Sequence, residues 1–235
     1  MSLTSVLSVI PRPRMQSWWR IALLLGSLMP VLGVHAAGSG GNDDFSDNSR
    51  GLSLEQRSGK AFRAGLKHRD RALKHEERAA QADTDKARQK SLDKAQKEYL
   101  KAVKQQGEAI KLYPRNYKAA NELGFALRKT GQYRKAIGAY NFALEINPNF
   151  HQATEYRGEA FLALGMYDQT RLSYMRLFRN DRDLADQLME KIEAWASVQS
   201  EPLSEEASAF LSWAAQRKQL ATLTSDLSLN NTRPW

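Results

Sequence analysis

The sequence contains no cysteine, few prolines and few aromatic residues. Without cysteine the chain can form no disulfide, use no thiol nucleophile and hold no zinc through thiolates, and it lacks the residue on which a lipoprotein is acylated. Only seven of its 235 residues are proline, so long stretches can run as uninterrupted helix. Charged residues make up 26% and aromatic residues 9% of the chain. This composition indicates a polar, globular and largely helical protein.

The motifs of common enzyme classes are also missing. There is no glycine-rich phosphate loop, no His-Glu zinc helix and no nucleophile elbow. His68 and His75 share a helix face but are two turns apart, too far to ligate one metal without partners. Glu76-Glu77 and Glu205-Glu206 fall on charged helix surfaces, and we expect the first pair to bind Lys and Arg four residues away. The sequence therefore predicts no enzymatic activity, metal or cofactor.

No acidic residue precedes Asp43, and the N-terminal segment has the pattern of an export signal. Three arginines come before the apolar run Ile21–Val34, and small residues follow it. This order is typical of a secretory signal peptide, with cleavage expected after Ala36 or one residue later. The protein is thus predicted to be exported, either periplasmic or secreted. Residues 21–37 are at the short limit for crossing a bilayer, so an uncleaved N-terminal membrane anchor is the alternative.

The excess of basic residues is confined to one part of the chain. Lys and Arg outnumber Asp and Glu by 19 to 9 between Arg50 and Lys118, but by only 13 to 14 from Ala119 to Trp235. A basic segment of this kind suggests an acidic partner, such as anionic lipid, nucleic acid or an acidic protein face. A solvated helix face rich in Lys and Arg is the simpler interpretation.

Residues of the same kind recur with a period of 34. The tyrosines at 99, 133 and 167 share this spacing, and so do two pairs of glycines. A period of this length is typical of a helix–turn–helix repeat. The positions that carry the repeat are small, aromatic or helix-ending residues: Tyr99, Ala102, Leu123, Gly124, Gly131, Tyr133, Ala136, Tyr140, Pro148, Gly158, Gly165, Tyr167 and Tyr174.

The arrangement resembles the tetratricopeptide repeat family, most clearly over residues 117–150. Leu123-Gly124 matches the Leu-Gly pair of the family, and Gly131 matches the glycine of the turn between the two helices. Ala136 matches the small residue of the second helix, and Pro148 the closing proline. Gly124 lets the partner helix approach closely, and Gly131 supplies the positive φ that ends the first helix. The resemblance implies an all-α solenoid of antiparallel helix pairs.

The neighbouring segments fit the repeat less well. The unit after Pro148 lacks a closing proline, so its second helix should end near Asn180-Asp181. The unit before residue 117 keeps only its second half, and we interpret it as degenerate, with its helices fused into one rod. We therefore divide the chain as follows: signal peptide 1–36, flexible leader 37–52, basic helix 53–82, degenerate unit 83–116, repeats 117–150 and 151–182, C-terminal capping helices 183–221 and flexible tail 222–235.

Helix-start signals organise the basic segment. Ser53 and Gln56 form a capping box that begins a helix. Asp83-Thr84-Asp85 is the one cap-like break before Leu112, so we expect a long helical hairpin that turns there. One continuous helix is the alternative.

The resemblance implies that the protein binds a partner. Peptide ligands in this family usually lie in the concave groove that is lined by the first helix of each repeat. By position, that groove would be lined here by Lys118, Asn121, Phe125, Arg128, Gln152, Glu155, Glu159 and Leu162. The set mixes cationic and anionic residues, and it lacks the array of Lys and Asn that would clamp a terminal carboxylate.

The sequence thus predicts a non-catalytic, exported scaffold that binds a protein or peptide partner through the concave groove. The alternative is a basic adaptor that associates with an anionic membrane surface or another polyanion through residues 50–118. Among partners, nucleic acid and a small-molecule substrate are not expected. Loss of partner retention in moderate salt would favour the basic helices over the groove.

Overall fold

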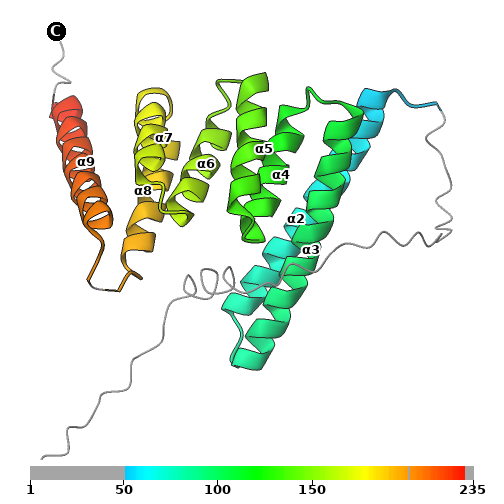
Figure 1. Cartoon of the computed structure of the whole chain (residues 1–235), viewed down its shortest axis with the longest axis horizontal. Coiled ribbons are helices and arrows are strands. Elements are labelled where there is room, and N and C mark those ends of the chain that lie inside the picture. The colour runs from blue at the N-terminus through cyan, green and yellow to red at the C-terminus, as the bar shows by residue number, and fades with distance from the viewer. Residues whose placement is uncertain (1–50, 201, 231–235) are drawn as a thin grey trace, which may run out of the picture.

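The computed structural model describes residues 51–200 and 202–230, and all regular structure in these ranges is helical (Figure 1). The all-α fold predicted from the sequence is therefore confirmed. The expected signal peptide and most of the leader lie outside the described residues. The helices are α2 (Leu54–Ala80), α3 (Asp85–Leu112), α4 (Tyr117–Lys129), α5 (Tyr133–Ile146), α6 (His151–Ala163), α7 (Tyr167–Asn180), α8 (Arg182–Ala196) and α9 (Glu205–Asn230).

The helices stand side by side in chain order, so the molecule is an open row rather than a closed bundle (Figure 1). Each helix packs against the next, and α2, α4, α6 and α8 also contact one another in succession. These four are the first helices of successive pairs, and they form one face of the row, which we call the inner face. Within the described residues, no helix is long and apolar enough to cross a membrane.

The helices α2 and α3 form the long hairpin at the N-terminal end of the row. The capping box is present, with the Ser53 Oγ accepting from the Gln56 amide at 3.2 Å and the Gln56 Oε1 accepting from the Ser53 amide at 2.9 Å. The chain turns where the cap-like break was noted, and Thr84 caps α3 through the Ala87 amide. With 27 and 28 residues, these helices are about twice as long as those of the repeats and extend beyond them (Figure 1).

Glycines set the close contacts of the repeats. Gly131 and Gly165 end the first helices of their pairs with φ of 77° and 69°, as the repeat pattern predicted. A Cβ on Gly124 would lie 2.5 Å from the Tyr140 ring, so only glycine permits this approach of α4 and α5. Because Gly131 and Gly165 are 34 residues apart, α4 and α6 end in the same way.

The C-terminal helices cover the last repeat. Asp181 ends α7 and caps α8, its carboxylate accepting from the Leu184 amide at 3.2 Å. The apolar face of α8 packs on α6 and α7, and Phe210 of α9 is fully buried against it. The helix α9 runs to Asn230, past residue 222 where a flexible tail was expected. No Pro or Gly lies between Glu205 and Asn230 to end it earlier.

Candidate partner-binding face

The eight predicted groove residues belong to α4 and α6, two of the inner-face helices, and they differ in exposure. Lys118 is exposed and Phe125 and Gln152 are half-buried, whereas only 14% of the Arg128 side chain is exposed. The other four, Asn121, Glu155, Glu159 and Leu162, are at most 9% exposed. A partner that docks on the folded protein can therefore reach the first four side chains more readily than the second four. Whether any of the eight contacts a partner stays a prediction.

Aromatic rings connect four helices, from α3 to α6. The Phe125 ring of α4 lies 6.1 Å from that of Tyr99 in α3 and 5.4 Å from that of Tyr156 in α6, measured between ring centres. Tyr140 of α5 follows at 6.1 Å from Tyr156. We call Tyr99, Phe125, Tyr140 and Tyr156 the aromatic seam. Ring pairs at these distances attract one another beyond the effect of area burial alone, so the seam holds α4 and α6 in register.

Arg128 lies over the aromatic seam. Its guanidinium carbon is 5.4 Å from the ring centre of Phe125 and 5.2 Å from that of Tyr156. Its Nη1 donates to the Glu159 Oε2 at 2.7 Å. Burial lowers the pKa of Arg128, but attraction by Glu159 and Tyr140 outweighs it, and the net pKa is raised. Arg128 thus stays charged and ties the first helix of one repeat to that of the next.

Glu155 lies beside this ion pair and is only 2% exposed. Burial, together with repulsion by Glu159, raises its pKa to about 8. Gln152 donates to its Oε2 at 3.1 Å. At neutral pH this carboxyl therefore holds its proton for much of the time. When Glu155 is protonated, Arg128 has one negatively charged carboxylate beside it, that of Glu159, instead of two.

Ion pairs attach the hairpin to the first repeat, and they differ from the pairs that we expected from the sequence. Glu76 was expected to pair within its own helix, but it binds Lys129 of α4 at 2.7 Å. Arg69 of α2 likewise donates to Glu122 of α4 at 2.9 Å. The expected pairing of Glu76 within its own helix was therefore wrong. Contacts between helices that are distant in sequence leave no periodic pattern from which they could be predicted. Tyr156 was also missed, although it lies on the same helix face as Gln152, one turn further on.

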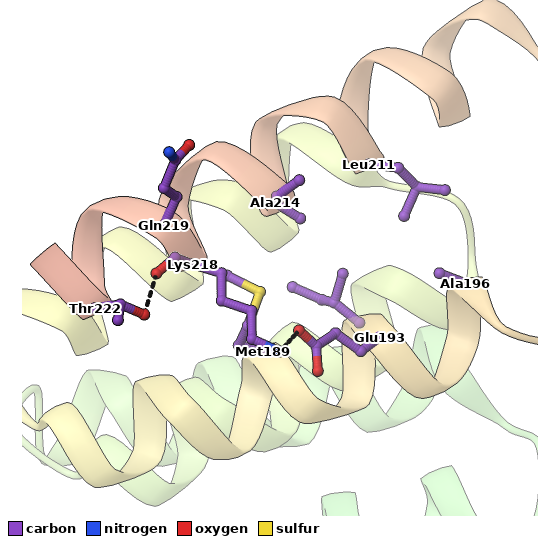
Figure 2. Close-up of a pocket in the computed structure, with 10 residues that line it drawn as sticks. Met189, Glu193, Ala196, Leu211, Ala214, Lys218, Gln219 and Thr222 are labelled. Carbon is purple, nitrogen blue, oxygen red and sulfur yellow. Dashed lines mark hydrogen bonds and ion pairs between the residues drawn. The ribbon is translucent and has the colours of Figure 1, made fainter.

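A hollow lies between α8 and α9. It has a volume of about 510 Å³ and is lined mainly by apolar side chains, among them Met189, Ile192 and Leu211 (Figure 2). Lys218 and Glu193 form an ion pair at its edge. In the described ranges, no three His, Asp or Glu side chains converge as a metal site would require. The hollow can make apolar contacts with a ligand, and the residues that line it include no His, Asp or Cys beside Glu193.

Comparison with known families gives a match for one helix pair of the row. Residues 117–150 match the model of the tetratricopeptide repeat. These residues are therefore similar to a tetratricopeptide repeat (TPR). The match coincides with α4 and α5 and with the positions of Gly124, Gly131 and Pro148. The similarity to a TPR thus covers one helix pair of the row, α4–α5.

Solved structures of TPR domains are similar to this chain at low sequence identity. The TPR2B domain of yeast Sti1, in complex with pHsp70, is 19% identical, with a TM-score of 0.37 over 69% of this chain and 98% of that one. The first TPR of Spaghetti (RPAP3), bound to an HSP90 peptide, is 17% identical, with a TM-score of 0.40 over 57% and 94%. The Arabidopsis OM64 TPR domain is 15% identical, with a TM-score of 0.35 over 67% and 98%. Comparison with curated proteins gave no match.

Proposed function

We propose that this protein is an exported, non-catalytic TPR scaffold whose inner face binds a segment of another protein. The observation that carries the proposal is the aromatic seam with Arg128 above it. Phe125 and Tyr156 stay half-buried, although large apolar side chains are usually covered within a stack. Half-covered aromatics beside an arginine are the residue types enriched in binding hot spots. The export part of the proposal rests on the N-terminal sequence pattern alone.

The chemistry of this face favours an internal peptide segment over a free carboxyl terminus. Asn121 is 3% exposed, so it is not available to a terminal carboxylate. The charge of Arg128 is already engaged by Glu159 at 2.7 Å. What remains accessible is an apolar ring surface with Lys118 and Gln152 at its edge. A partner segment with an apolar or aromatic anchor and a neighbouring acidic side chain fits this surface best.

Site-specific photo-crosslinking tests the proposal. A photoreactive amino acid is placed at Lys118 or Gln152 on the inner face, and at Lys135 of α5 as the matched exposed control. The protein is then irradiated in cells that express it. We expect both inner-face positions to capture the same protein and the control position not to capture it. Capture from the control position alone, or different proteins from the two inner positions, would contradict a binding groove here.

A further inference from the structure

The helix α2 carries a straight line of cationic side chains. Six of its eight basic residues recur every three or four positions, and all six are exposed: Lys60, Arg63, Lys67, Arg71, Lys74 and Arg78. At about 100° per residue they fall within an arc of about 80° and extend over about 27 Å. The four acidic residues of α2 all lie outside this arc. We call these six residues the α2 basic stripe.

The α2 basic stripe is directed away from the repeats. Arg69 and Glu76 of α2 form ion pairs with Glu122 and Lys129 of α4. By helical geometry these two positions lie on roughly the opposite side of α2 from the stripe. The hairpin also extends beyond the shorter helices (Figure 1). A large, flat partner can therefore approach the stripe without meeting the solenoid.

Within the described residues, the charges of the stripe are largely without acidic partners. Among the residues that the structure describes, Arg71 alone of the six has an acidic partner, Glu98, at 4.0 Å. The helix α3 adds seven more exposed lysines and arranges them at similar spacing: Lys86, Lys90, Lys94, Lys97, Lys101, Lys104 and Lys111. Of these seven, Lys101 is the one with an ion pair in the described part of the chain, again to Glu98. The hairpin is thus a rod with a strong positive field.

We propose that this hairpin docks on the surface of an anionic lipid bilayer through the α2 basic stripe. A bilayer surface requires no shape complementarity, because each Lys or Arg near it contributes separately to the attraction. The stripe follows one side of a single helix, which suits a flat surface. The inference goes beyond the peptide-binding role, which belongs to the inner face, and places the scaffold against a membrane.

Two other classes of partner fit the stripe less well. Protein interfaces have an apolar centre and are depleted in lysine, whereas the arc of the stripe holds no apolar residue between Lys60 and Arg78. Single-stranded nucleic acid is bound through aromatic side chains that stack on its bases, and the arc holds none. Base readout in a duplex groove uses Asn and Gln beside Arg, and these too are absent from the arc between the same two residues.

Sedimentation with lipid vesicles tests the proposal on the full chain. The probes are vesicles of phosphatidylcholine alone and vesicles of phosphatidylcholine and phosphatidylglycerol in equal parts. The stripe variant carries Lys60→Gln, Lys67→Gln and Lys74→Gln. The control variant carries Arg134→Gln, Lys135→Gln and Arg179→Gln, which remove the same charge from exposed positions of α5 and α7. Circular dichroism establishes that both variants are as helical as the parent.

The readout is the ratio of affinities for the two kinds of vesicle, since the apolar Ile21–Val34 segment would favour both equally. We expect the stripe variant to lose on the order of a hundredfold in affinity for anionic vesicles, because each lysine contributes a factor of about five. The control variant should stay within about threefold of the parent. Equal losses in both variants, or equal binding to neutral vesicles, would overturn the proposal. Binding to duplex DNA or to an acidic protein without binding to anionic vesicles would overturn it as well.

Discussion

Arg128 of α4 and Glu159 of α6 form an ion pair of 2.7 Å that joins the first helices of two successive helix pairs. Their side chains are only 14% and 9% exposed. The Arg128 guanidinium lies over the rings of Phe125 and Tyr156, so this side chain makes both charge and aromatic contacts. The ion pair and the ring contacts therefore hold α4 and α6 together, and they do so without a bound partner.

Removal of one member of this pair should destabilise the protein. Glu159→Gln leaves Arg128 charged and largely buried without its carboxylate, and we expect a loss of about 1–3 kcal/mol in the free energy of unfolding. Urea denaturation measures it. Glu193→Gln is the matched control, because its partner Lys218 is 60% exposed and surface pairs contribute little. Equal losses in the two variants would show that the buried pair has no special role.

The protonation of Glu155 should make stability depend on pH. Its pKa is about 8 in the folded chain and near its ordinary value of 4.5 in the unfolded chain, so the folded state binds the extra proton between these values. Stability contributed by this group is then fully present below about pH 4.5 and is lost as pH rises through about 8.

Denaturation of the parent and of Glu155→Gln across this pH range checks the expectation. The parent should lose stability relative to the variant as pH rises, by at most about 1.4 kcal/mol per pH unit. A difference between the two proteins that stays constant from pH 5 to 9 would contradict it.

Two glycines of the same repeat should respond in opposite ways to alanine. In Gly124→Ala the new Cβ would lie 2.5 Å from the Tyr140 ring, and such overpacking costs about 1–3 kcal/mol. In Gly138→Ala nothing lies within 4 Å, and replacing a glycine within a helix should stabilise the protein by up to about 1 kcal/mol. Thermal denaturation of the two variants measures both effects. Two changes of the same sign would contradict the close approach of α4 and α5.

The N-terminal pattern makes a chemical prediction. If the signal is cleaved as expected, protein recovered from the producing cells should begin at Ala37 or Gly38. The mass of the intact protein establishes which residue comes first. Recovery of the uncut chain in the membrane fraction would favour the anchor instead.

The sequence could predict those parts of the fold that depend on local chemistry. Ser53 with Gln56, and the positive φ of Gly131, are properties of a few neighbouring residues, and the structure has them as expected. The depth of the groove residues could not be predicted in this way. The helix α6 is contacted by α4, α5, α7 and α8, so nearly all its faces are covered and its sequence shows little amphipathic pattern. Glu155 and Glu159 are buried by neighbours that their own helix does not reveal.

The most direct test of the central claim measures the affinity for a captured partner after either of two phenylalanines is replaced by alanine. Phe125 and Phe178 are both half-buried, and both have an arginine over the ring, but one lies on the inner face and the other on α7. Titration calorimetry should show that Phe125→Ala lowers the affinity for the partner about tenfold or more, as expected for an aromatic hot spot. The affinity of Phe178→Ala should stay close to that of the parent. Unchanged affinity in Phe125→Ala, or equal loss in both variants, would contradict binding through the inner face.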